Sequence, residues 1–172
     1  VESAVELGII NELAAAKNKV ASIALRINPE VDAHTHAKIT TGMKENKFGI
    51  NLSQLGGVLD KLKEMKNVKL IGIHSHIGSQ ITDMSSFRNL VIRFNEIQEE
   101  LEAHGVTVEN LNFGGGLGID YYHPNHLSIP AFDNYFAAIH KLLQVRPGQQ
   151  VHFEPGRSIV AQCGTLISKV LY

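Results

Sequence analysis

The residues whose types and spacing most clearly suggest catalysis or binding lie in "HFEPGR", residues 152 to 157. Alternating apolar and polar residues bring Glu154 to a strand end, and a Pro-Gly turn then leads to Arg157. An inward-facing carboxylate is costly to bury unless it meets a positive partner. Glu154 could therefore be a general base, a metal ligand or the partner of a protonated ring nitrogen. The structural alternative is an ion pair with Arg157 or Arg26. Arg157 suits two-pronged binding of a carboxylate or phosphate.

A second chemical motif is the glycine run in "NFGGGLG", residues 112 to 118. Three consecutive glycines, Gly114, Gly115 and Gly116, leave backbone N–H groups unobstructed, and such a turn can cradle a phosphate. The alternative is an ordinary tight turn, for which glycine is the default residue. Ser79, in "HIGSQ", could add a hydroxyl donor to the same anion, or it could simply be a surface loop residue.

Two histidine pairs raise the question of a metal site. His74 and His76 are two residues apart on a predicted strand, so their side chains share one face. His34 and His36 form a second pair, in a loop. Neither pair has a recognisable third ligand, so we predict no metal. A histidine at a strand end can instead hydrogen-bond, or lie flat against an aromatic ligand.

Composition narrows the function classes. The chain has 172 residues, of which 44% are hydrophobic, and its net charge is −1. This balance predicts no nucleic-acid partner and no basic membrane surface. The apolar runs are far shorter than the ~20 residues of a membrane span. The single cysteine excludes an intramolecular disulfide and a Cys-rich zinc site. We expect a soluble cytoplasmic protein.

Helical and strand patterns alternate along the chain. This order predicts a parallel sheet covered by helices. Four helices are expected. The first spans 3–17 and repeats apolar residues at helical spacing: Leu7, Ile10, Leu13 and Ala14. The second begins near 53, and the fourth begins at Pro130. The third runs from a cap at Ser85 or Ser86 to Gly105 and carries an apolar stripe: Phe87, Leu90, Val91, Phe94, Ile97 and Leu101. The expected strands are 20–28, 68–77, 107–113, 150–154 and 164–172.

Four of these strands have one apolar and one polar face. In 20–28, for example, Ile23, Leu25 and Ile27 oppose Arg26 and Asn28. An open doubly wound sheet is buried on both faces and is apolar almost throughout. A barrel instead turns one face toward the helices and the other toward an interior, where polar groups meet at the carboxyl ends of the strands. The pattern therefore favours a (β/α) barrel.

Together, several of these segments resemble the alanine-racemase-like, fold-type III enzymes that bind pyridoxal phosphate. The stretch from residue 32 to residue 50 is similar to the diaminopimelate-decarboxylating branch. The resemblance implies a partial (β/α)8 barrel over 1–160 and the first strand of a C-terminal β-domain over 161–172. It rests on "RINPEVDAHTHAKITTGMKENKFGI", "GIHSHIGSQI", "NFGGGLGIDY" and "FEPGRSIVA", of which "HSHIGSQ", "GGGLG" and "EPGR" are shared with related amino-acid decarboxylases.

The resemblance also implies residue roles for the conversion of meso-2,6-diaminopimelate to L-lysine and CO2. Glu154 and His76 would be the catalytic residues, the first pairing with the pyridine nitrogen and the second stacking on the ring. Arg157 would meet the substrate carboxylate. The cofactor-binding set would be His76, Ser79, Gly114, Gly115, Gly116, Glu154, Pro155, Gly156 and Arg157.

The chain also departs from the family pattern. No lysine stands in the motif of the cofactor-attaching lysine; Lys38, Lys44 and Lys47 lie in the 32–50 stretch instead. Cys163 does not match the catalytic cysteine of the C-terminal domain, and we expect it to be a packing residue. We therefore expect an internal fragment of a longer homodimeric enzyme, inactive by itself. The alternatives are an ornithine, arginine or carboxynorspermidine decarboxylase, a non-catalytic barrel that binds pyridoxal phosphate, and a metal-dependent barrel hydrolase.

Overall fold

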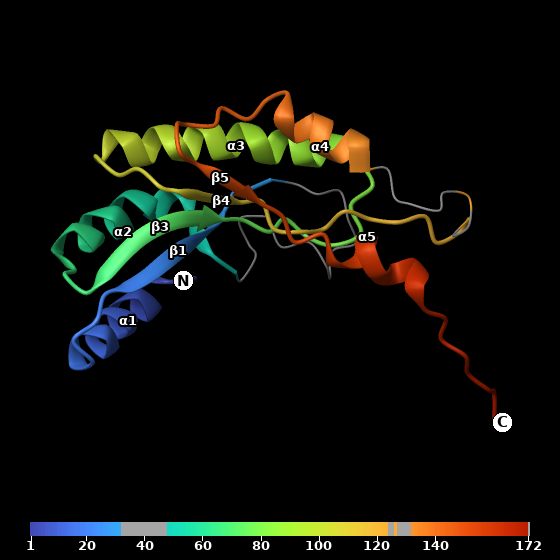
Figure 1. Cartoon of the computed structure of the whole chain (residues 1–172), viewed down its shortest axis with the longest axis horizontal. Coiled ribbons are helices and arrows are strands. Elements are labelled where there is room, and N and C mark those ends of the chain that lie inside the picture. The colour runs from blue at the N-terminus through green and yellow to red at the C-terminus, as the bar shows by residue number, and fades with distance from the viewer. Residues whose placement is uncertain (32–47, 124–125, 127–131, 172) are drawn as a thin grey trace.

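The centre of the molecule is a parallel sheet. A computed structural model describes residues 1–31, 48–123, 126 and 132–171. Within these residues, five strands pair in the order β2-β1-β3-β4-β5. All pairs are parallel, and in Figure 1 the strands run toward α5. The strands are β1 (Ala21–Asn28), β2 (Ile50–Asn51), β3 (Val68–His74), β4 (Asn110–Asn112) and β5 (Gln150–His152).

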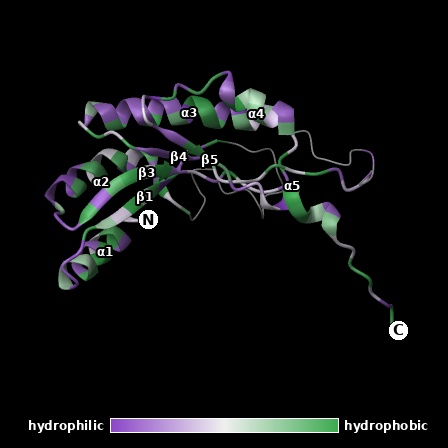
Figure 2. Cartoon of the chain, in the orientation of Figure 1, coloured by the Kyte–Doolittle hydropathy of each residue, from purple (hydrophilic) through white to green (hydrophobic). Residues whose placement is uncertain are grey.

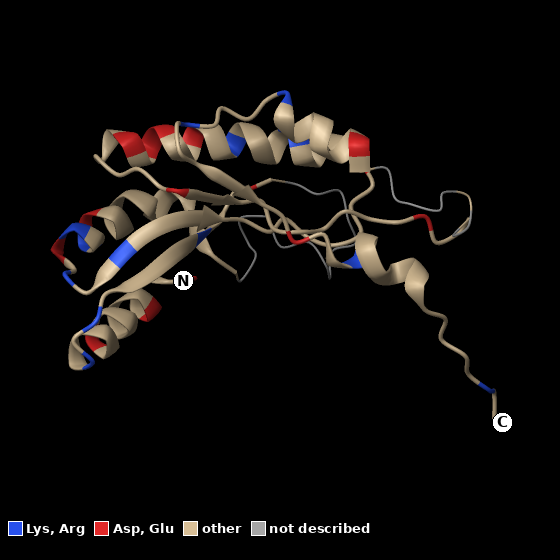
Figure 3. Ribbon diagram, viewed as in Figure 1, with Lys and Arg blue, Asp and Glu red and all other residues tan. Residues whose placement is uncertain are grey.

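The helices follow the predicted alternation and flank the strands (Figure 1). Charged residues of both signs occur along α1, α2 and α3 (Figure 3). No helix in the described residues is long and apolar enough to cross a membrane. The helices are α1 (Ala4–Ala16), α2 (Leu52–Glu64), α3 (Met84–Ala103), α4 (Phe132–His140) and α5 (Gly156–Val160), followed by a 3-10 turn at Ala161–Cys163.

The core lies between the strands and the helices α1, α2, α3 and α4. The predicted apolar stripe of α3 is confirmed, because its six members are all buried: Phe87, Leu90, Val91, Phe94, Ile97 and Leu101. Phe94 stacks on Phe113, with ring centroids 4.0 Å apart, and Phe113 lies 5.9 Å from Phe153. Strand alternation turns the neighbours of these rings to the opposite face. The chain is therefore held immediately before Gly114 and Glu154. Figure 2 shows the apolar colouring along β1 and β3.

Three expectations about single elements were wrong. The cap of α3 is Asp83, whose carboxylate accepts from Ser85 N–H, rather than Ser85 or Ser86. Leu13 of α1 is 57% exposed, because α1 buries the faces of Leu7 and Ala14 instead. Cys163 is exposed rather than packed.

The expected strand at the end of the chain is also not formed. Residues 164–171 have no regular secondary structure and are exposed. A strand is stabilised by the hydrogen bonds of a neighbouring strand, and none of the described residues pairs with this segment. The domain boundary between 160 and 161 stays a prediction.

The cap of α3 gives a first testable prediction. The Asp83 carboxylate oxygen accepts from Ser85 N–H at 2.8 Å, which satisfies one of the unpaired donors of the helix start. Asp83→Ala should lower the free energy of unfolding by about 1 kcal/mol, measured by urea denaturation. Asp60→Ala, at an exposed ion pair with Lys63, is the control and should stay within about 0.5 kcal/mol of wild type. Equal losses in both variants would contradict the capping role.

Candidate functional site

Three loops meet at the carboxyl edge of the sheet. They are residues 75–81 after β3, 113–118 after β4 and 153–157 after β5, here called the three site loops. Gly115 N–H donates to His76 Nδ1 at 3.2 Å. Glu154 N–H donates to Gly114 O at 2.7 Å, and Ile81 pairs with Leu117 as an isolated parallel bridge. The structure thus brings together residues that lie far apart in the sequence.

The glycines allow the site loops to touch backbone to backbone. Gly114 and Gly116 have φ angles of +65° and +107°, which side-chain-bearing residues rarely adopt. A Cβ on Gly116 would lie 2.5 Å from Gly78 O. The N–H of Gly116 has no hydrogen-bond partner among the described residues. The run is therefore more than a convenient turn, because it combines a close backbone contact with a backbone donor that has no partner in the described part of the chain.

The carboxylate of Glu154 is contacted by an amide and an imidazole rather than by an arginine. Its Oε1 accepts from Asn112 Nδ2 at 2.9 Å, and His74 Nε2 lies 3.8 Å from the same oxygen. The other oxygen, Oε2, has no partner in the described part of the chain, and the side chain is 55% exposed. The alternative of an ion pair with Arg26 or Arg157 is not formed. Arg26 binds Glu2 Oε1 at 2.6 Å instead.

Arg157 lies in a cluster of hydrogen-bond donors. Its Nη2 donates to Ser79 Oγ at 3.2 Å, and its Nη1 donates to Tyr121 Oη. The guanidinium carbon also lies 5.8 Å from the centre of the Tyr121 ring. A guanidinium beside two hydroxyls is suited to bind an anion. Sequence reasoning did not identify Tyr121, although it closes the quoted motif "NFGGGLGIDY".

His74 ends β3 and His76 lies in the loop after it, and both have a pKa lowered in the direction that favours the neutral imidazole near pH 7. Burial lowers the pKa of His74, and the Glu154 carboxylate only partly opposes this effect. Burial also lowers the pKa of His76, and Arg26 lowers it further. A neutral ring is what the geometry requires, because Nδ1 of His76 accepts a hydrogen bond and a doubly protonated imidazole has no acceptor.

The lowered pKa values predict how stability depends on pH. The unfolded histidines titrate near pH 6.5 and the folded ones below it, so the unfolded state binds more protons in this window. The histidine contribution to stability is therefore complete above about pH 6.5 and is lost as the pH falls through the folded pKa. Urea denaturation from pH 5 to 8 should show a smaller slope in His74→Gln than in wild type. An unchanged slope would contradict the shift.

A metal centre has no support in the described residues, where no group of three His, Cys, Asp or Glu side chains is placed to hold an ion. The histidine pair His34 and His36 lies outside the described residues, as do Lys38, Lys44 and Lys47.

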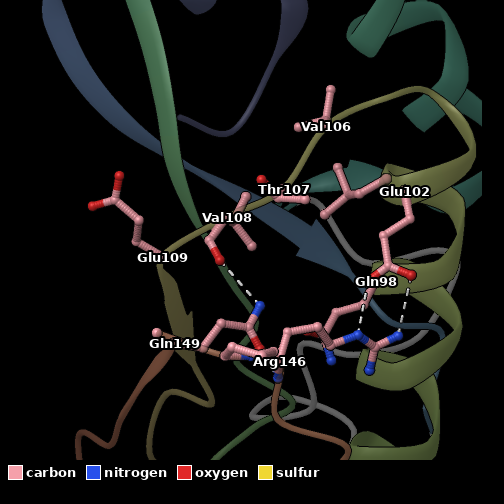
Figure 4. Close-up of a pocket in the computed structure, with 11 residues that line it drawn as sticks. Gln98, Glu102, Val106, Thr107, Val108, Glu109, Arg146 and Gln149 are labelled. Carbon is pink, nitrogen blue, oxygen red and sulfur yellow. Dashed lines mark hydrogen bonds and ion pairs between the residues drawn. The ribbon is translucent and has the colours of Figure 1, made fainter.

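The hollow drawn in Figure 4 lies at the ends of β4 and β5 that are opposite the three site loops, as its lining residues show. It measures about 370 Å³ and is lined by residues that precede β4 and β5, including Thr107 and Gln149. Arg146 crosses it to Glu102 at 2.7 Å. Its walls share no residue with the three site loops, so it is not the candidate site.

Comparison with known proteins agrees with this geometry. Residues 1–161 match the family described as "Pyridoxal-dependent decarboxylase, pyridoxal binding domain". The chain belongs to this family. It is 60% identical over all its residues to a diaminopimelate decarboxylase of Bacteroides thetaiotaomicron, and covers 45% of that protein. It is 41% identical to the diaminopimelate decarboxylase of Haemophilus influenzae, and covers 41% of it. The chain thus spans less than half the length of these relatives.

Solved structures confirm the predicted fold class. Diaminopimelate decarboxylase from Helicobacter pylori, complexed with L-lysine, matches 92% of this chain at 35% identity with a TM-score of 0.82. The match covers 39% of that structure. An arginine decarboxylase of Paramecium bursaria Chlorella virus matches at 26% identity with a TM-score of 0.69, covering 91% of this chain and 38% of that one. The parallel sheet is accordingly part of an alanine-racemase-like barrel.

The residues of the site fit the family's cofactor, pyridoxal phosphate. The donors at Ser79, Arg157 and Gly116 suit a phosphate. The neutral ring of His76 and the carboxylate of Glu154 suit a heteroaromatic ring with a protonated nitrogen. The family match and the donor set therefore agree.

Proposed function

We propose that this chain supplies the cofactor-binding barrel of an enzyme that converts meso-2,6-diaminopimelate to L-lysine and CO2. The observation that carries the proposal is the meeting of a carboxylate, a neutral imidazole and an anion-binding cluster at one sheet edge. The 60% identity to a diaminopimelate decarboxylase supports this substrate over ornithine, arginine or carboxynorspermidine.

The residue roles follow from the chemistry of each group. Ser79, the Gly114–Gly116 turn and Arg157 bind the phosphate. His76 stacks on the ring, while Pro155 and Gly156 shape the loop beside it. When bound, pyridoxal phosphate accepts the electron pair that loss of CO2 leaves on the substrate. Glu154 keeps the ring nitrogen protonated, which is most favourable where water is excluded.

In this proposal Arg157 binds both the phosphate of the cofactor and the carboxylate of the substrate. Its contact with Ser79 supports a position for one side of the guanidinium beside the phosphate. Nη1, which donates to Tyr121 Oη, carries a second N–H that can bind the carboxylate of a substrate. A planar, two-pronged group is well matched to both anions.

The test uses the complete gene product that contains these residues. Purified protein with pyridoxal phosphate should release CO2 from meso-diaminopimelate with a kcat/KM at least ten times that for ornithine, arginine or carboxynorspermidine. A preference for one of these three compounds would show that the proposed substrate is wrong, and the proposed cofactor would stand. Failure to bind pyridoxal phosphate would overturn the whole proposal, and stoichiometric zinc would favour a hydrolase. The 172-residue chain alone should release no CO2. A homodimer and a cytoplasmic location remain predictions.

A further inference from the structure

We propose that Asn112 is a positioning residue, whose single side-chain amide orients both Glu154 and the glycine turn. Glu154 Oε2 is then the oxygen that meets the cofactor nitrogen. The inference rests on the proposed function. It concerns a residue at the end of β4, between two of the three site loops.

The two contacts of Asn112 are short and different in kind. Its Nδ2 donates to Glu154 Oε1 at 2.9 Å. Its Oδ1 accepts from Gly114 N–H at 2.8 Å, two residues further along the chain. The first contact spans 42 positions, so one side chain joins the loop after β4 to the loop after β5.

The chemistry of the partners fixes the orientation of the amide. A carboxylate can only accept, and a backbone N–H can only donate. Only one of the two amide orientations satisfies both partners. Rotation by half a turn would face oxygen with oxygen and nitrogen with nitrogen. Asn112 is therefore oriented by its neighbours and in turn orients them.

This contact decides which oxygen of Glu154 remains for a ligand. Oε1 carries the Asn112 bond and has His74 Nε2 at 3.8 Å, whereas Oε2 has no partner among the residues that the structure describes. A half-exposed glutamate has several rotamers of similar energy, and a hydrogen bond to one oxygen selects among them. Asn112 thus presents Oε2 without touching the reacting atoms.

A matched control lies on the same strand. Asn110 occupies the same face two residues earlier, where its Nδ2 donates to Ile71 O and its Oδ1 lies 2.8 Å from His152 Nε2. Neither contact involves Glu154 or the glycine turn. Asn110→Ala therefore removes a similar polar network from β4 while leaving the proposed alignment in place.

Two variants of Asn112 separate its two contacts. Asn112→Ala removes both. Asn112→Asp keeps an acceptor for Gly114 N–H but turns a second carboxylate toward Glu154. Equilibrium dialysis of the complete gene product against pyridoxal phosphate should show the dissociation constant rise roughly tenfold or more in both variants, the scale of a lost hydrogen bond to a charged group. Asn110→Ala should stay within about twofold of wild type.

Hydrogen exchange of the cofactor-free protein supplies a readout independent of activity. Exchange at Gly114 should accelerate at least about tenfold in Asn112→Ala and stay near wild type in Asn112→Asp, because only the alanine variant loses the acceptor. In Asn112→Asp we therefore expect normal hydrogen-exchange protection at Gly114 together with weakened cofactor binding. A purely structural role would not produce this combination.

The outcomes separate the two proposals. If wild type binds pyridoxal phosphate and Asn112→Asp binds it as tightly, the positioning role is overturned and the proposed function stands. The same holds if Asn110→Ala weakens binding as much as Asn112→Ala does. If wild type does not bind pyridoxal phosphate, the proposed function falls and the inference falls with it.

Discussion

Replacing Glu154 with alanine in the complete gene product should lower kcat for meso-diaminopimelate by at least about 10²-fold, the scale of removing a preorganised electrostatic group from an active site. The variant leaves the ring nitrogen without its carboxylate. Asn112 and His74, which now lie at 2.9 and 3.8 Å from Oε1, cannot replace the negative charge. Steady-state kinetics at saturating pyridoxal phosphate measures the loss.

Two companion variants make the Glu154 result interpretable. Glu154→Gln keeps the size and loses the charge, so it should show most of the same loss. Glu109→Gln, just before β4, removes a carboxylate that pairs with Lys69 at 2.9 Å, and should leave kcat unchanged. Near-normal turnover in Glu154→Ala would refute the assigned role, as would an equal loss in the Glu109 variant.

Gly115→Ala should destabilise the fold by about 3 kcal/mol, the upper part of the usual range for overpacked sites. A Cβ at this position would lie 2.1 Å from Glu154 O, a backbone atom that cannot move without shifting the loop after β5. The same shift would displace the Glu154 side chain, so cofactor binding should fall as well. Urea denaturation and equilibrium dialysis measure the two effects.

The control for this variant is Gly57→Ala on the exposed side of α2. Apart from its chain neighbours and its own helix backbone, no atom lies within 4 Å of its added Cβ, and glycine inside a helix costs roughly 0.5–1 kcal/mol relative to alanine. Gly57→Ala should therefore stabilise the protein slightly. If Gly115→Ala is as stable as wild type, the close approach of the two site loops is not present in solution.

Patterns with a strong periodicity could be predicted from the sequence. The stripe of α3 and the apolar face of β1 depend on residue spacing alone, and both are buried as expected. The convergence of His76, Gly115 and Glu154 followed from the rule that parallel strands share a carboxyl edge. Their chemical roles stay predictions.

The individual partners of polar groups could not be predicted in this way. Glu154 pairs with Asn112 rather than an arginine, because the Arg26 guanidinium reaches Glu2 at 2.6 Å and Arg157 turns to Ser79. Such choices depend on side-chain rotamers and on contacts across many residues. One local signal was present: an asparagine two residues before a glycine commonly accepts the N–H of that glycine.

The most direct test of the account is a crystal structure of the complete gene product with bound pyridoxal phosphate. The account predicts phosphate oxygens within about 3.2 Å of Ser79 Oγ and of the Arg157 guanidinium. It also predicts the ring nitrogen at hydrogen-bond distance from Glu154 Oε2, with the His76 imidazole against the ring. A cofactor bound away from the three site loops, or with its nitrogen facing a group other than Glu154, would contradict the account.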